Sequence, residues 1–237
     1  MNTRVYNDKV NINNKMTEDF WKQRGNKTIS LKSVFLGEDF QNNADILRNQ
    51  REFEIVNAMT KDLSSLKILD IGCGIGRWAE NFKDKLDLYT GIDYTEGFIE
   101  YAQHKYADYK NINFSRMSIL DLNPTDFMNK YNLILCCGVL MYINDNDISN
   151  ILKTLKSCKP EYMYIQESIS LMSGHLTLNN FKSKELKTNY SAIYRTKSKY
   201  ENYFKQNDIS VINTGLLLDS KIGAREETNA QYWVLKG

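Results

Sequence analysis

The 237-residue sequence lacks a long apolar run and an excess of either charge. No segment approaches the roughly 18 uninterrupted apolar residues of a membrane-spanning helix, and residues 1–15 contain no apolar core of a secretion signal. The 31 basic and 29 acidic side chains leave a net charge of +2, so no overall field favours DNA or an anionic membrane. We therefore expect a soluble, cytoplasmic protein without a membrane span.

Metal-ligating side chains are also scarce. The chain has only four cysteines and two histidines: Cys73, Cys136, Cys137, Cys158, His104 and His175. They form neither paired CxxC spacing nor a Cys/His cluster, which argues against a structural zinc site. Carboxylates are not clustered as a magnesium site would require. We expect no metal, and we expect the adjacent Cys136 and Cys137 to be buried, reduced side chains.

Short apolar runs alternate with helical patterns from residue 66 onward, which is typical of an α/β fold with helices on both faces of a mostly parallel sheet. The pattern predicts strands near 66–71, 87–92, 112–117, 131–137 and 161–167, and helices near 76–85, 95–108, 123–129 and 145–158. After a helix near 197–207, two further runs at 209–218 and 229–236 have no helical pattern between them. Because a parallel pair needs a long crossover, these last strands are expected to be antiparallel.

The length favours one domain with elaborations. Residues 1–65 are interpreted as a mainly helical N-terminal extension, with an apolar stripe from Phe53 to Met59. Residues 66–237 form the main domain. The polar, tyrosine-containing segment at about 168–195 follows the fifth strand and is expected to cover a substrate, because long segments at the carboxyl edge of such sheets commonly do so.

The stretch ILDIGCGIGRW places Gly72, Gly74 and Gly76 directly after a strand that ends near Asp70. Glycines let the backbone turn sharply and approach a ligand, and the following helix points its free amides at that ligand. About 20 residues later, YTGIDY places Asp93 at the end of the next strand, where a carboxylate can accept hydrogen bonds from ribose hydroxyls. Together these features predict a site for an adenosine-bearing molecule.

The motifs ILDIGCGIG, GID and YNLILCCGVLMYI resemble the class I S-adenosylmethionine-dependent methyltransferases. The resemblance implies a seven-stranded Rossmann-like sheet of order 3-2-1-4-5-7-6 with the last strand antiparallel. It also implies S-adenosylmethionine as cofactor and S-adenosylhomocysteine as product. A nicotinamide-dependent oxidoreductase or epimerase stays open as an alternative, although the glycine spacing is GxGxG rather than GxGxxG. A non-catalytic cofactor-binding module is a third possibility.

The resemblance also assigns the cofactor contacts around the first two strands. Gly72, Cys73 and Gly74 would line the methionine and ribose portions, and Asp70 would support the amino group. Asp93 would bind the ribose hydroxyls. The residues assigned to the adenine are Tyr94, Met117, Ser118 and Ile119, where Ser118 stands in place of the acidic residue of many family members and leaves Asp121 as an alternative.

Further contacts are assigned after the fourth strand and in the N-terminal extension. Cys136 would offer its carbonyl to the cofactor, and Val139 and Tyr142 would lie near the sulfonium. Trp21 and Arg24, three residues apart on one helical face, would fold over the cofactor, with Arg24 pairing with the methionine carboxylate. Alternatively, Arg24 is a surface arginine beside a packed tryptophan.

Candidate catalytic groups are His175, Glu167 and Tyr142. His175 has the right intrinsic pKa for a general base, and Glu167 ends a strand at the catalytic edge. The alternatives are an exposed loop histidine, a carboxylate that caps a turn, and a tyrosine that only packs.

The candidate substrate contacts are Tyr190, Tyr194 and Arg195, in a segment that resembles small-molecule methyltransferases. The guanidinium of Arg195 would grip a phosphate or carboxylate. DNA is disfavoured because CCGV replaces the (N/D)PP(Y/F) motif and neither Pro124 nor Pro160 precedes a cysteine. We expect methyl transfer to a small polar or anionic acceptor: a sugar, nucleotide-sugar or phosphoryl-type group of a surface polysaccharide or natural product. The oligomeric state stays open.

Overall fold

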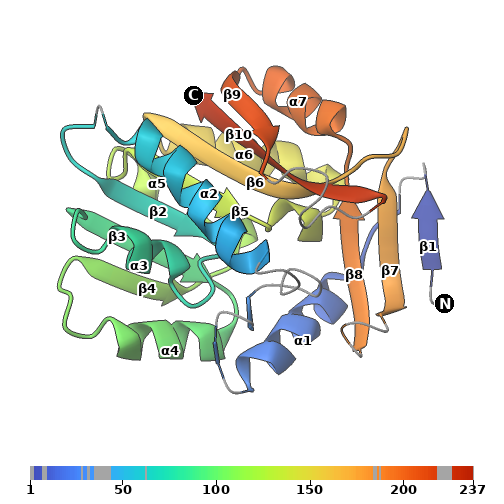
Figure 1. Ribbon diagram of the computed structural model, residues 1–237, viewed down its shortest axis with the longest axis horizontal. Helices are drawn as coiled ribbons and strands as arrows, with labels where there is room; N and C mark the ends of the chain where they lie inside the picture. The colour runs from blue at the N-terminus through green and yellow to red at the C-terminus, as the bar shows by residue number, and fades with distance from the viewer. Residues whose placement is uncertain are drawn as a thin grey trace.

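The computed structural model describes residues 3–6, 10–27, 29–30, 33–34, 44–61, 63–183, 186, 188–217 and 226–236. A seven-stranded sheet runs through it (Figure 1). Its strands are β2 (Lys67–Ile71), β3 (Leu88–Asp93), β4 (Ile112–Arg116), β5 (Leu133–Cys137), β6 (Tyr162–Ser170), β9 (Ser210–Leu216) and β10 (Thr228–Lys236). The order β4-β3-β2-β5-β6-β10-β9, with β10 antiparallel to both neighbours, confirms the predicted topology.

Helices cover both faces of this sheet. They are α2 (Ala44–Met59), α3 (Arg77–Phe82), α4 (Glu96–Lys105), α5 (Pro124–Phe127), α6 (Asp145–Ser157) and α7 (Lys197–Gln206), with 3₁₀ helices η3 (Ile119–Asp121) and η4 (Leu140–Tyr142). In β5, Leu133 and Leu135 pack toward α2, α3 and α4, whereas Ile134 and Cys136 pack toward α5, α6 and α7. A strand covered on both faces buries both sets of alternate side chains, which explains its continuous apolar sequence.

The N-terminal region contains helix α1 (Asn14–Gly25) and α2, as expected, but also a strand, β1 (Thr3–Tyr6). The expected helical extension is therefore only partly helical in its described residues. Helix α2 contributes Ile55 and Val56 to the same apolar cluster as β2 and α3. It belongs to the core of the main sheet.

A second, three-stranded antiparallel sheet has the order β1-β7-β8 and stands at one end of the molecule (Figure 1). Strands β7 (Leu176–Ser183) and β8 (Thr188–Tyr194) fall in the segment at about 168–195, for which the sequence had predicted only a polar insertion. In β8 the residues from Tyr190 to Tyr194 are all buried. No helix in the described part of the chain combines the length and apolarity needed to cross a bilayer.

Candidate active site

A cavity of about 240 Å³ lies at the carboxyl ends of β2, β3, β4 and β5, and α1 and β8 also contribute to its wall. It brings together most of the residues that the sequence assigned to cofactor and acceptor. Those that line it are Trp21, Asp70, Gly72, Cys73, Gly74, Asp93, Tyr94, Met117, Ser118, Ile119, Val139, Tyr142, Tyr190 and Tyr194. Side chains and loops more than 170 residues apart in the sequence therefore meet in one space.

The glycine loop needs its glycines for two physical reasons. Gly72, Gly74 and Gly76 have φ angles of +67°, +53° and +78°, a left-handed region that other residues enter only at a cost. A Cβ on Gly72 would lie 2.4 Å from Cγ2 of Val139. The loop therefore passes closely under the segment that follows β5, and no side chain fits between them.

One buried and one half-buried carboxylate, those of Asp70 and Asp93, frame this loop. Asp93 accepts hydrogen bonds from the amides of Gly74 (3.1 Å) and Thr95 (2.8 Å), so it fixes the loop to the end of β3, and burial raises its pKa. Asp70 accepts a hydrogen bond from the Tyr89 hydroxyl at 2.6 Å. Burial raises the pKa of Asp70 to about 7, against the opposing effects of Tyr89 and Arg77. Both carboxylates border the space that the resemblance assigns to the cofactor.

Aromatic rings form another part of the wall. Tyr142 lies edge-to-face with Trp21 at 5.6 Å and with Tyr190 at 6.1 Å between ring centroids. The hydroxyls of Tyr142 and Tyr190 are 2.9 Å apart and hydrogen-bonded. Burial raises the pKa of both tyrosines well above 10, so they stay neutral hydroxyls at physiological pH.

One face of α1 closes the cavity. Asn14, Thr17, Glu18 and Trp21 all line it, and their spacing of i, i+3, i+4 and i+7 places them on one side of the helix. A helix that packs on an apolar core presents an apolar stripe, whereas this face is mostly polar. The arrangement suits a wall of a polar binding site. Trp21 was predicted from the sequence, and its three helical neighbours were not.

Two residues assigned to the cofactor do not line the cavity. The Arg24 guanidinium lies 5.7 Å from the centre of the Trp21 ring, and its Nε donates to the Ser33 carbonyl at 2.8 Å. Cys136 is fully buried in the core, and the neighbouring Cys137 lines the cavity instead. The two-residue period of β5 turns Cys136 toward the covering helices.

Three residues assigned to catalysis or acceptor binding also lie outside the cavity lining. Glu167 is fully buried, and its carboxylate accepts hydrogen bonds from three backbone amides. His175 faces Asp145, with 3.9 Å between Nε2 and Oδ2, and burial lowers its pKa. Arg195 is fully buried, and its guanidinium pairs with Asp145 at 2.7 Å, so it is not placed to grip an acceptor.

The sequence analysis missed a polar part of the wall. Arg48 and Arg77 line the cavity and both contact the buried Glu52, with N–O distances of 3.8 and 2.6 Å. Arg77 directly follows the glycine loop, a position that could have drawn attention to it. Arg48, on α2, lies far from any motif. Ser168, Thr228 and Asn229, at the ends of β6 and β10, also line the cavity.

No group of three or more His, Cys, Asp or Glu side chains is placed to hold a metal ion within the described ranges.

Comparison with known proteins identifies the central part of the chain. A family model described as a methyltransferase domain matches residues 68–160. Malonyl-[acyl-carrier protein] O-methyltransferase of Acetivibrio thermocellus is 31% identical over 98 residues, 40% of this chain and 33% of that protein. Phosphoethanolamine N-methyltransferase 3 of Arabidopsis thaliana is 23% identical over 159 residues, 66% of this chain and 31% of that protein. The chain thus spans about a third of the length of these two relatives.

Solved structures have the same fold over nearly the whole chain. A SAM-dependent methyltransferase of Leishmania major has a TM-score of 0.72 at 15% identity, over 94% of this chain and 82% of that one. Phosphoethanolamine N-methyltransferase 1 of Haemonchus contortus, in complex with phosphoethanolamine and S-adenosylhomocysteine, also has a TM-score of 0.72. It is 18% identical, over 94% of this chain and 48% of that one. Residues 68–160 therefore match the model of a methyltransferase domain, and the chain has the fold of solved S-adenosylmethionine-dependent methyltransferases.

Proposed function

We propose that this protein transfers a methyl group from S-adenosylmethionine to a small polar acceptor. One observation carries the proposal: a single cavity joins the glycine loop and Asp93 to the wall of Tyr142 and Tyr190. The first part has the features of a nucleoside site and the second offers neutral hydroxyls to a second molecule. The matched methyltransferase domain supports the same function.

The residues present fit this cofactor. The missing Cβ at Gly72 and Gly74 lets Val139 and Val34 pack directly against the glycine loop, and Asp93 borders the same cavity. Tyr94, which follows Asp93 directly, also lines the cavity. Met117, Ser118 and Ile119 would flank the adenine.

When bound, the cofactor supplies an electrophilic methyl group. The protein then has to align the acceptor with that methyl group, and positioning at near-attack distance supplies much of the acceleration. Tyr142 and Tyr190 would hold the acceptor by hydrogen bonds from their neutral hydroxyls. The segment at about 168–195, which includes β7 and β8, would cover it.

The acceptor itself is proposed only as a chemical class. Phosphoethanolamine and malonyl-[acyl-carrier protein] in the relatives' names support a small polar or anionic molecule. Sugars, nucleotide-sugars and phosphoryl-type groups, including those of surface polysaccharides or natural products, remain the proposed panel. Because Arg195 is paired with Asp145, an anionic acceptor would need other contacts than this arginine.

Calorimetric titration of the wild type with S-adenosylmethionine, S-adenosylhomocysteine and NAD tests the cofactor. We expect the two sulfur nucleosides to bind and NAD not to bind. Asp93→Ala should weaken their binding at least about tenfold, because a carboxylate that holds the loop and would bind the ribose is lost. Asp108→Ala, which removes an exposed carboxylate that does not line the cavity, is the control.

Binding of NAD alone would instead favour the oxidoreductase alternative. Transfer of a radiolabelled methyl group from S-adenosylmethionine to the acceptor panel, with phosphoethanolamine and malonate included, then tests catalysis. A non-catalytic module would be favoured if the cofactor binds but no acceptor is methylated. Tyr142→Phe and Tyr190→Phe would then alter no reaction.

A further inference from the structure

The segment that connects β5 to α6 is held by the carboxylate of Glu167 on one side. Oε1 accepts hydrogen bonds from the amides of Val139 (2.9 Å) and Leu140 (2.7 Å), and Oε2 accepts one from Met141 (3.1 Å). Glu167 is fully buried near the end of β6, a strand fixed between two neighbours. Three consecutive amides are therefore bound to one rigidly placed group.

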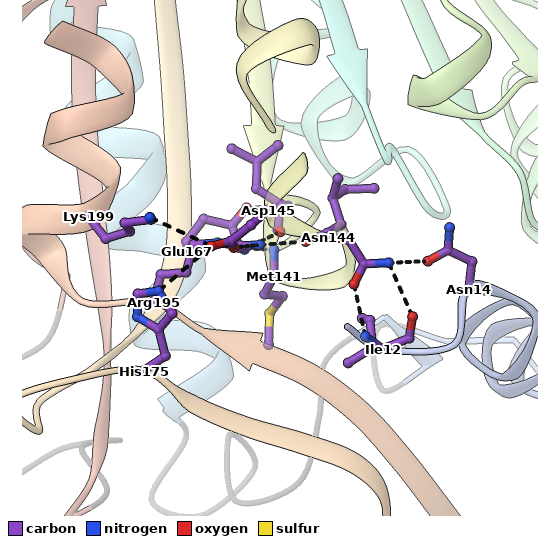
Figure 2. Close-up of polar contacts among 11 residues, drawn as sticks. Ile12, Asn14, Met141, Asn144, Asp145, Glu167, His175, Arg195 and Lys199 are labelled. Carbon is purple, nitrogen blue, oxygen red and sulfur yellow. Dashed lines mark hydrogen bonds and ion pairs between the residues drawn. The ribbon is translucent and has the colours of Figure 1, made fainter. Parts of the chain in front are cut away.

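Arg195, which directly follows β8, holds the same segment. Its Nη1 donates to the Leu140 carbonyl at 2.8 Å and its Nη2 donates to the Ile143 carbonyl at 2.6 Å. Its Nε donates to Asp145 at 2.7 Å, at the start of α6. Figure 2 shows Arg195 and Glu167 close to the segment that carries Met141, Asn144 and Asp145. The carbonyls and the amides of one short loop thus have separate charged partners.

Asn144 extends this network to the N-terminal segment (Figure 2). Its side chain accepts from the Ile12 amide at 2.8 Å and donates to the Ile12 carbonyl at 3.2 Å and to Asn14 at 3.3 Å. Asn144 precedes α6 but makes no side-chain capping bond to that helix. Its amide group is used to attach the start of α1.

Two cavity residues depend on the backbone of this loop. Val139 lies in contact range of Gly72, where an added Cβ would be 2.4 Å from its Cγ2. Tyr142 carries the hydroxyl that reaches Tyr190. A shift of about 1 Å in the backbone would move both, and misplacements of that size cost catalysis heavily.

We propose that Glu167 and Arg195 are positioning residues that fix residues 139–145 in place. Through this segment they set Val139 against the glycine loop and Tyr142 against Tyr190. This inference rests on the proposed function and assigns Glu167 a role other than proton transfer. Its carboxylate already accepts three amides and does not line the cavity. Arg195 acts through the loop and not on the acceptor.

Hydrogen exchange of residues 139–143, with binding of S-adenosylhomocysteine, tests the positioning. Glu167→Gln keeps the shape but replaces one acceptor oxygen by an amide group that cannot accept the Met141 amide. We expect exchange in this segment to accelerate about tenfold or more, because a hydrogen bond to a charged group is lost. S-adenosylhomocysteine should bind several-fold more weakly. Arg195→Lys, which keeps the charge and loses the fork, should accelerate exchange in the same segment.

The dependence on pH separates positioning from a general loss of structure. Burial raises the pKa of Glu167 to about 7 despite its amide donors, so its carboxylate forms between pH 6 and pH 8. Because this pKa lies above its ordinary value, formation of the carboxylate lowers stability, so protection of residues 139–141 in the wild type should fall over this range. Glu167→Gln should lack this fall. The charged and titratable groups that interact electrostatically with Glu167 are Arg195, Tyr200, Cys136 and Tyr142. Those around Arg195 are Asp145, Lys199 and His175.

Glu161→Gln and Arg51→Lys are matched controls, because both side chains are exposed and lie outside the cavity. Unchanged exchange at 139–143 in Glu167→Gln, or equal acceleration across the whole chain, would overturn the proposal. If Glu167→Gln does not fold, protection of residues 139–141 that does not change with pH in the wild type, or unchanged exchange at 139–143 in Arg195→Lys, would overturn it as well. A wild type that fails to bind S-adenosylhomocysteine contradicts the proposed function. The exchange data would still test whether Glu167 and Arg195 hold residues 139–145 in place.

Discussion

Gly72 and Gly138 have the same φ of +67° but different surroundings. A Cβ on Gly72 would meet Val139 at 2.4 Å, whereas a Cβ on Gly138 would meet nothing within 4 Å. Each alanine substitution should cost about 1–2 kcal/mol of unfolding free energy for the left-handed backbone. Gly72→Ala should cost a further 1–3 kcal/mol or so, because Val139 has to move.

Urea unfolding of both alanine variants measures this difference directly. Titration with S-adenosylhomocysteine should show a large loss of affinity for Gly72→Ala and a smaller loss for Gly138→Ala. Equal destabilisation of the two variants would contradict the close approach of the loop to Val139.

Asp70 should make the stability of the protein depend on pH. Its pKa is about 7 in the folded protein and 3.8 ordinarily, so its contribution is fully present below about pH 4 and is lost as the pH rises through 7. The loss should approach about 4 kcal/mol for a shift of this size. Asp70→Asn, which still offers an oxygen to Tyr89, should remove this loss.

Thermal or urea unfolding at pH 5 and pH 8 checks the sign. The wild type should lose more stability than Asp70→Asn between these two values. Parallel pH curves for the two proteins would show that Asp70 does not titrate in this range.

At the scale of elements, Asn144 joins the start of α6 to the segment before α1. Asn144→Ala removes the hydrogen bonds to Ile12. It removes no capping bond of α6, because the Asn144 side chain makes none. Exchange at residues 10–13 should accelerate, and S-adenosylhomocysteine should bind more weakly because α1 closes the cavity.

Thr196→Ala is the matched control for this element. Its side chain does cap α7, by accepting from the Lys199 amide, so its loss should cost about 1 kcal/mol of stability. Residues 10–13 should be unaffected. Acceleration at residues 10–13 in both variants would mean that the N-terminal segment responds only to global stability.

The strands of the main sheet could be predicted because each carries its own signal. β5 reads as LILCC, an uninterrupted apolar run that is typical of a strand covered on both faces. The runs at β9 and β10 without a helix between them indicated the antiparallel end of the sheet.

Strands β1, β7 and β8 lack such a signal. β7 reads as LTLNNFKS, which is polar over half its length, and it pairs with β1 more than 170 residues away. A pairing at that distance depends on the rest of the fold having formed. Local sequence patterns therefore do not predict the pairing of β7 with β1.

At the scale of the whole molecule, the cavity couples binding to folding. Its wall includes parts of α1, the glycine loop, η3, η4 and β8, so it exists only in the folded chain. S-adenosylhomocysteine at 100 times its Kd should therefore raise the unfolding free energy by about 2.7 kcal/mol. Asp93→Ala should show a smaller increase at the same ligand concentration.

A thermal shift series with increasing S-adenosylhomocysteine measures this linkage. NAD at the same concentrations is the control and should leave the midpoint unchanged. A midpoint that does not move with S-adenosylhomocysteine would contradict binding to the folded state.

The sequence by itself determined the strands of the main sheet and the position of the glycine loop with Asp93, whereas the order of the strands was predicted from the resemblance to a known family. These features depend on local patterns, namely apolar runs, glycines that relieve backbone strain, and a carboxylate at a strand end. The placement of Glu167, Arg195 and His175 outside the cavity lining was decided only by the tertiary structure. A charged side chain at the carboxyl edge can point into the cavity or toward the backbone of a loop. Glu167 and Arg195 bind the segment after β5 because its amides and carbonyls would otherwise be buried without partners.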